Sequence, residues 1–215
     1  MRSEGFRPIR VQISKVPGDC TMLGQLLDQI RGYYVDRFID TVNQYAEADG
    51  VTVAYESALC NADGSVVTEG VLGLPVRGDL LVIRDGAVSD SIQIDTDGML
   101  SFEPIAFEWP ENNLDVDLRP FQWNWMQLRI FGLQNNADWA PIRDWFIGWF
   151  QEEDPEDGEL LAGVHFLSDP ELGCDYSQVS IDLGTSPVES FEELLDAIGQ
   201  MGATGVQIGR FEERT

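Results

Sequence analysis

The sequence contains a single histidine, His165, and Cys174 follows it a short way along the chain. A thiol and an imidazole that meet across a hairpin can act as a nucleophile and its general base, with a carboxylate to orient the imidazole. However, no cysteine-enzyme motif surrounds Cys174, and His165 lies in the apolar run LLAGVHFL, which is typical of a hydrogen-bonded histidine in a core strand. We therefore predict that the protein is not an enzyme, and we keep a small enzyme that uses Cys174 and His165 as an alternative.

Several acidic stretches have some features of a metal site or an acid–base pair. In IQIDTDGMLSFEP, aligning Gly98 with the glycine of a calcium-binding EF-hand loop places Gln93 first and Pro104 twelfth, so the first and last ligands are missing. Asp-Gly between two alternating apolar runs predicts a hairpin turn instead. Phosphate-binding, dinucleotide-binding and serine-hydrolase motifs are absent. A glycosidase-like carboxylate pair stays open, but it means little among 38 acidic residues. The sequence predicts no metal site and no cofactor.

The most acidic segment directly follows a strongly apolar one, in the stretch DWFIGWFQEEDPEDGEL. Trp145 and Trp149 share one face of the predicted helix, and Phe146 and Phe150 share the adjacent face. Burial statistics favour a wide core stripe for these rings. Aromatic side chains beside carboxylates also have the composition of a binding hot spot for a partner rich in Arg or Lys. We predict a partner-binding surface made of Trp149, Glu152, Glu153, Asp154, Glu156, Asp157 and Glu159.

The charge of the chain restricts the classes of partner. Its 215 residues include 13 basic and 38 acidic ones, which gives a formal net charge of −25. Such a field repels nucleic acids and anionic membranes and attracts basic proteins, although a uniformly acidic surface also serves solubility alone, as in halophiles. The content of hydrophobic residues, 43%, is too high for a disordered acidic tail.

The cysteines and the apolar runs indicate the compartment. Three cysteines without a CxxC pair form neither a disulfide framework nor a zinc knuckle. The N-terminal stretch MRSEGFRPIRVQISKVPG lacks the apolar core of a secretory signal, and no apolar run reaches the roughly 18 residues of a membrane span. We expect a reduced, soluble, cytoplasmic protein, and the sequence does not indicate its oligomeric state.

The periodicity of the chain predicts an α+β protein with antiparallel β-sheets. Alternation at Ile9, Val11 and Ile13 predicts a first strand, and apolar residues three and four apart predict a long helix within residues 21–50. From residue 51 the period becomes two, which predicts an antiparallel meander. The turns of this meander are expected at Asp63-Gly64, Asp85-Gly86 and Asp97-Gly98.

The polar stretch EWPENNLDVDLRP has no helical period, and we place a boundary between two lobes there. The first lobe, 1–110, is the helix plus the meander, and the second is 118–215; a single compact unit is the alternative. The second lobe is expected to contain, in order, strand 121–133, helix 137–151, strands 160–167 and 175–183, a helix capped by Ser186, and strand 204–211. This β-α-β-β-α-β order is the ferredoxin-like arrangement.

The C-terminal half, with DWAPIRDWFIGWFQEEDPEDGELLAGVHFL followed by a strand and a short capped helix, resembles the immunity proteins encoded beside bacterial antibacterial toxins, including those of type VI secretion. The resemblance is one of general pattern, without a defined motif. It implies a non-enzymatic cytoplasmic inhibitor that binds one cognate toxin and blocks its active site. The residues point independently to an acidic protein that neutralises a basic partner.

A DNA mimic, whose surface carboxylates imitate phosphates and occupy a nucleic-acid-binding protein, is a second alternative. A mimic needs a long stripe of carboxylates, whereas an inhibitor needs one concentrated patch with apolar anchors. The clustering of acidic residues at 111–117 and 152–159 favours the patch.

Overall fold

The computed structural model describes residues 22–61, 63–95, 98–134, 136–150 and 160–211. The elements are α1 (Met22–Ala46), β1 (Val51–Ala58), β2 (Thr68–Glu69), β3 (Leu74–Pro75), β4 (Arg77–Arg84), β5 (Ala87–Ile92), β6 (Ile105–Trp109), β7 (Leu114–Leu118), β8 (Met126–Phe131), α2 (Ala140–Phe150), β9 (Phe166–Leu167), β10 (Glu171–Leu172), β11 (Tyr176–Asp182), α3 (Val188–Gln200) and β12 (Gly205–Gly209). The predicted α+β class is confirmed. The strand predicted at Ile9, Val11 and Ile13 lies outside the described residues.

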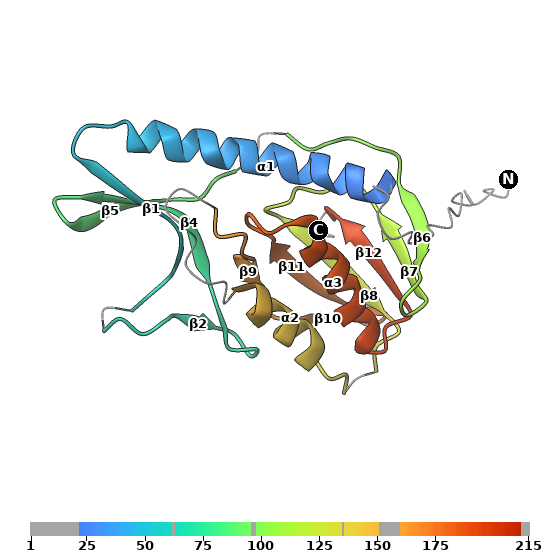
Figure 1. Ribbon diagram of the computed structural model, residues 1–215. Helices are drawn as coiled ribbons and strands as arrows, with labels where there is room; N and C mark the ends of the chain where they lie inside the picture. The colour runs from blue at the N-terminus through green and yellow to red at the C-terminus, as the bar shows by residue number, and fades with distance from the viewer. Residues whose placement is uncertain (1–21, 62, 96–97, 135, 151–159, 212–215) are drawn as a thin grey trace, which may run out of the picture.

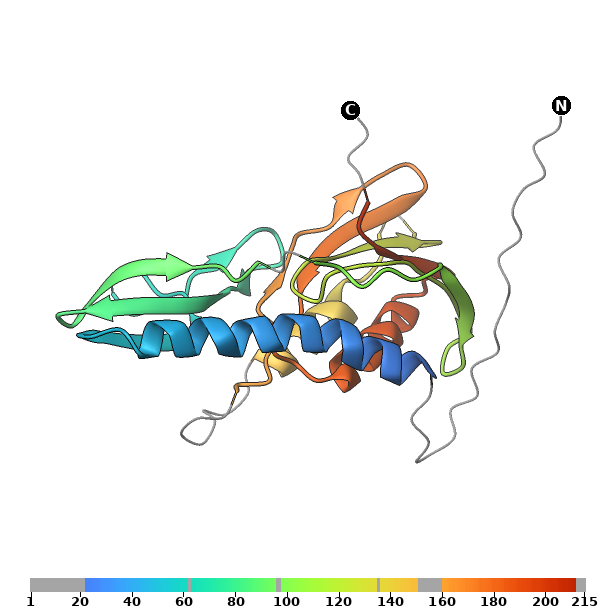
Figure 2. The ribbon, with the colours of Figure 1, turned by 90° about the horizontal axis from the view of Figure 1, so that it is seen from above.

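Helix α1 runs along two of the three sheets that the described residues form, a three-stranded smaller sheet and a seven-stranded larger sheet (Figures 1 and 2). It contacts β1 and β4 of the smaller sheet and α3 beside the larger one. Its buried side chains recur three or four residues apart, as on one face of a helix, and they are Leu23, Leu27, Ile30, Tyr34 and Phe38. Among the described helices, none combines the length and the apolarity that crossing a membrane requires.

The smaller sheet is antiparallel, with the strand order β1-β4-β5. Asp85 (φ 51°) and Gly86 (φ 76°) form the turn between β4 and β5. Two successive residues with positive φ are typical of a tight hairpin turn, so the turn predicted at this Asp-Gly pair is confirmed. The turn predicted at Asp97-Gly98 includes Asp97, which lies outside the described residues.

The larger sheet contains the strand order predicted for the C-terminal half. Strand β8 lies between β11 and β12 and is antiparallel to both. Strands β9 and β10 both pair with the other edge of β11, as two pieces of one interrupted strand. Together with α2 and α3, these strands follow the ferredoxin-like order β-α-β-β-α-β.

Two further strands extend this sheet across the predicted lobe boundary. Strand β7 pairs in parallel with β12, and β6 pairs with β7, so residues from both predicted lobes lie in one sheet. The stretch EWPENNLDVDLRP is therefore a hairpin. Asn113 turns the chain with a φ of 56°, and the side-chain oxygen of Asn112 accepts a hydrogen bond of 3.1 Å from the N–H of Leu114. Alternating buried residues at Leu114, Val116 and Leu118 then point into the core.

Helices α2 and α3 pack against each other on one face of the larger sheet (Figure 2). Trp145, Phe146 and Phe150 of α2 are buried, so these rings form the wide core stripe that burial statistics favour. The N-cap of α3 lies one residue later than expected from the sequence. Pro187 is the N-cap, and the hydroxyl of Ser186 instead forms a 2.8 Å hydrogen bond with that of Ser190.

Candidate functional site

The predicted partner-binding surface lies mostly outside the described residues, which include only Trp149 from the predicted set. The indole Nε1–H of Trp149 donates a 2.9 Å hydrogen bond to Oε2 of Glu193 on α3, so this ring is half-buried beside a carboxylate. The remaining predicted residues, outside the described ranges, are Glu152, Glu153, Asp154, Glu156, Asp157 and Glu159.

The alternative pair of His165 and Cys174 has no geometric support. Both ring nitrogens of His165 are in contact with carboxylate oxygens. Cys174 is exposed in the turn between β10 and β11, whereas the imidazole is fully buried. The histidine therefore has carboxylates as its partners rather than a thiol.

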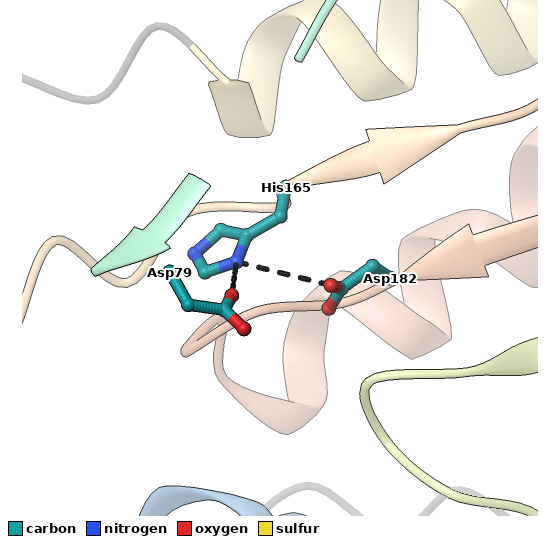
Figure 3. Close-up of side chains that lie close together, drawn as sticks. All are labelled: Asp79, His165 and Asp182. Atoms are coloured by element: carbon teal, nitrogen blue, oxygen red, sulfur yellow. Dashed lines mark hydrogen bonds and ion pairs between the residues drawn. The ribbon is translucent and has the colours of Figure 1, made fainter. Parts of the chain in front are cut away.

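His165 lies at the centre of a buried cluster of three carboxylates. Its Nδ1 is 2.9 Å from Oδ1 of Asp79 and 4.0 Å from Oδ2 of Asp182, and Figure 3 shows both aspartates facing this nitrogen. Its Nε2 is 3.0 Å from Oε1 of Glu56. None of the four residues is more than 6% exposed. Ionisable groups are buried this completely only when they are paired or bound to a metal ion.

Further hydrogen bonds fix the two aspartates that face Nδ1. The Tyr34 hydroxyl donates to Oδ1 of Asp79 at 3.1 Å. The backbone N–H of Ile94 donates to Oδ2 of the same residue at 2.6 Å. The N–H of Gly184 donates to Oδ1 of Asp182 at 2.8 Å. Each aspartate is thus held by a donor that does not belong to the imidazole.

Glu56 reaches the cluster from an unusual backbone conformation. It lies in β1 between Tyr55 and Ser57, which pair with Leu80 and Gly78 of β4, and its φ is 51°. A non-glycine residue in this left-handed region costs of order 1–3 kcal/mol, and such residues concentrate at functional sites. Its carboxylate accepts a 2.8 Å hydrogen bond from the N–H of Leu161 and another from the hydroxyl of Thr185.

The backbone of His165 connects the two sheets. Its N–H donates to the carbonyl oxygen of Asp182 in β11, and its own carbonyl accepts from the N–H of Arg77 in β4, both at 3.0 Å. The ring then packs against Gly184, where a Cβ atom would collide with the imidazole. The cluster therefore lies where the smaller sheet meets the larger one.

The cluster changes the protonation of its members. Burial opposes the charge of the imidazole and is the largest influence, but the hydrogen bonds to Asp79 and Glu56 and the charge of Asp182 outweigh it, and the pKa of His165 rises from 6.5 to about 10. Burial raises the pKa of Asp182 from 3.8 to about 7, against the opposing charge of His165. For Glu56, burial acts to raise the pKa, but the hydrogen bond and the charge of His165 lower it below its usual 4.5.

A cleft of about 430 Å³ opens beside the cluster, between the two sheets. Asp79 and Asp182 line it, whereas His165 is fully buried. The other walls are largely apolar and include Leu59, Ile92, Trp125 and Phe166. A mostly apolar cleft with a few converging ionisable groups is the usual form of a small-molecule site.

The free energy of unfolding is expected to fall as the pH rises from 6.5 to about 10. The folded state holds the His165 proton more tightly than the unfolded state, so the stabilisation is complete below pH 6.5 and is lost as the pH passes the folded pKa of about 10. Asp182 acts in the same sense between pH 3.8 and about 7. Glu56 acts in the opposite sense, since its lowered pKa stabilises the fold above pH 4.5.

Urea unfolding across this pH range measures the effect, which is expected to be a few kcal/mol for so buried a group. In His165→Gln the fall between pH 6.5 and about 10 should be much smaller than in the wild type. Equal slopes in the two proteins would contradict the assignment.

Comparisons of the chain with protein-family models, with curated proteins and with solved structures found no match. The function therefore has to be inferred from the geometry of this site and from the charge of the chain.

The sequence indicated His165 as a hydrogen-bonded histidine of a core strand, but it did not indicate the three carboxylates that contact it. A signal for them exists, because Glu56, Asp79 and Asp182 are single acidic residues within or beside apolar strand segments, AYESAL, GDLLVIR and VSIDLG. An acidic residue at an inward position of a strand needs a buried partner. The sequence does not show which of its many acidic residues share one.

Proposed function

We propose that the protein binds one divalent transition-metal ion beside the cleft, through Asp79, Asp182 and Nδ1 of His165. The observation that carries this proposal is that Nδ1 faces both aspartates (Figure 3), with the three potential ligand atoms within 4.8 Å of one another. Metal–ligand bonds of about 2.1 Å place neighbouring ligand atoms roughly 3 to 3.5 Å apart. The distances of 2.9 Å and 4.0 Å from Nδ1 lie on either side of this range, so small side-chain rotations suffice.

The charge of the cluster also favours a cation. Three carboxylates surround one imidazole, so the negative charges outnumber the positive one even when His165 is protonated. A dication in place of the Nδ1 proton reduces this excess, and buried charges are stable only when they are compensated. The stretch 93–104, at which the sequence argues against a metal site, contains none of these four side chains.

Glu56 leaves Nδ1 available to a metal ion. A carboxylate that accepts a hydrogen bond from Nε2–H holds the imidazole in the tautomer whose lone pair is on Nδ1. Glu56 lies at hydrogen-bonding distance from Nε2 of His165. The carboxylate–histidine–metal arrangement is common in metalloproteins, and the outer carboxylate both orients the ring and strengthens it as a ligand.

The ligand set indicates the kind of metal. One imidazole nitrogen and two carboxylates suit Mn²⁺, Fe²⁺ or Zn²⁺, whereas Mg²⁺ and Ca²⁺ favour oxygen ligands alone. Because Asp79 and Asp182 line the cleft, a metal ion held by them has an open side toward it. Water or a ligand can complete the coordination there.

The chelator-treated protein is expected to bind one equivalent of Zn²⁺ or Mn²⁺, and Asp182→Asn should weaken this binding at least about 100-fold. Loss of an outer-shell partner weakens metal binding by about 10- to 100-fold, and loss of a ligand should exceed that. The substitution keeps the shape of the side chain and an acceptor for the N–H of Gly184. Isothermal titration calorimetry measures the affinity, and elemental analysis measures the metal content.

Asp144→Asn is the matched control, because it removes one carboxylate from an exposed position on α2, where the side chain is 73% exposed. Its metal affinity should equal that of the wild type, and Glu56→Gln should fall between the two. If the wild type and all three variants bind the metal ion equally weakly, the binding reflects diffuse attraction to an acidic surface. The cluster would then be a structural ion network.

A second candidate function is an acidic protein of the immunity type that binds a basic partner. It is favoured by a surface pocket between α2 and α3, near Trp149, whose acidic residues are Asp138, Asp144, Glu193 and Asp196. Carboxylates on an exposed surface speed association with a cationic partner. Such binding needs no metal ion. A basic partner that binds the chelator-treated protein and Asp182→Asn as well as the wild type would favour this function.

A further inference from the structure

Trp125 is an exposed residue in the wall of the cleft. It is 41% exposed, whereas the other five tryptophans are buried or half-buried, and Trp123, two residues earlier, is only 1% exposed. Trp125 precedes β8 in a tight turn closed by its own N–H, which donates to the carbonyl of Gln122 at 3.0 Å. A large flat apolar ring at the wall of a small-molecule cleft offers a surface on which a second flat group can stack.

The other walls define the polarity of the ligand. Leu59, Val76, Ile92 and Phe166 contribute apolar surface, and the two aspartates are the acidic residues of the lining. With the metal ion bound, the strongest polar attraction in the cleft comes from its open coordination positions. The cleft therefore has the proposed metal site at one end and apolar side chains along its walls.

Charge excludes one large class of ligands. The guanidinium of Arg77, the basic residue of the lining, donates to the carbonyl oxygens of Glu56 and Phe150 at 2.6 Å each. It also lies over the ring of Phe150. Its charge is thus directed to the protein's own backbone, and the chain as a whole carries −25. Polyanions such as nucleotides and polyphosphates are repelled by such a field.

We propose that the cleft binds a small molecule that presents two adjacent oxygen donors to the metal ion and stacks a flat apolar group on Trp125. The proposal rests on the metal site proposed above, because the oxygen donors occupy the coordination positions that face the cleft. A volume of about 430 Å³ suits such a molecule and excludes a folded polymer.

The test compares hydroxamates, which chelate metal ions through two adjacent oxygens, on the full-length protein loaded with Zn²⁺. Benzohydroxamic acid carries a phenyl ring, acetohydroxamic acid carries a methyl group, and benzamide has the ring without the chelating pair. Benzohydroxamate is expected to bind at least about tenfold more tightly than acetohydroxamate, because a buried aromatic group adds apolar contact. Benzamide should bind far more weakly than either. Calorimetry gives the affinities, and metal content is measured before and after each titration.

Trp125→Ala should reduce the preference for the phenyl hydroxamate to less than about threefold while leaving Zn²⁺ affinity unchanged. Trp125→Phe should retain most of it, because the flat surface remains. Trp139→Ala is the control, since it removes a half-buried tryptophan outside the lining of this cleft, and it should keep the full preference.

The outcomes separate this inference from the proposed function. If Zn²⁺ binds through Asp182 but the two hydroxamates bind equally, or Trp125→Ala keeps the preference, the ligand inference is wrong and the metal site stands. If the wild type takes up no Zn²⁺ that depends on Asp182, both are wrong.

Discussion

Replacement of His165 by leucine is expected to lower the free energy of unfolding by about 3 to 5 kcal/mol, because it leaves buried carboxylates without their cation. Asp79 and Glu56 flank the two ring nitrogens, and each would face an apolar side chain after the substitution. Equilibrium unfolding in urea of the chelator-treated proteins measures the change.

Arg119→Leu is the control for this loss. Arg119 pairs with Asp117 at 2.7 Å, but the arginine side chain is 44% exposed, so removing this cation should change stability by less than about 1 kcal/mol. Adding Glu56→Gln and Asp79→Asn to the leucine variant should recover part of the loss, because neutral amides tolerate burial better than carboxylates. A leucine variant as stable as the control would mean that the imidazole does not compensate these carboxylates.

Gly184→Ala is expected to destabilise the protein by at least about 2 kcal/mol more than the same change at Gly202. Both glycines have positive φ, 54° and 83°, so the backbone strain of an alanine is similar at the two sites. They differ in the space available. A Cβ at Gly202 meets nothing within 4 Å, whereas one at Gly184 would overlap the His165 ring and lie 2.5 Å from the carbonyl oxygen of Gly163.

Thermal and urea unfolding of the two variants give the comparison. Because the methyl group would overlap the ring at Cδ2 and Nε2 and so displace it from its present position, Gly184→Ala should also weaken Zn²⁺ binding, and Gly202→Ala should not. Equal destabilisation at the two positions would show that backbone strain alone matters and that the ring can move at little cost.

The sequence allowed the prediction of elements that are specified by neighbouring residues. The apolar spacing of α1 and the Asp85-Gly86 turn are local signals, and both elements form as expected. The β6–β7 hairpin was not predicted. Its asparagines and aspartates are also typical of a polar connection between two lobes, which is why a boundary was predicted there. The burial of Leu114, Val116 and Leu118 depends on β12, which lies far along the chain.

The candidate site could be predicted only in part for the same reason. His165 stood out as the single histidine, but Glu56, Asp79 and Asp182 are three of 38 acidic residues, and only the packing of the two sheets brings them to one ring. The partner surface at Trp149 and residues 152–159 stays a prediction.

The long separation along the chain between members of the cluster has a consequence for how the protein is made. Asp79 is 86 residues from His165, and Glu56 is 109. During synthesis from the N-terminus, the two carboxylates emerge well before the imidazole that compensates their charge. Until the imidazole is present, the carboxylates of the β1–β4 pair stay exposed to water. Contacts this distant in sequence form late and slowly. The proposed metal site needs residues from both sheets. A metal ion therefore binds after synthesis and folding are complete, and it does not assist the folding of the growing chain.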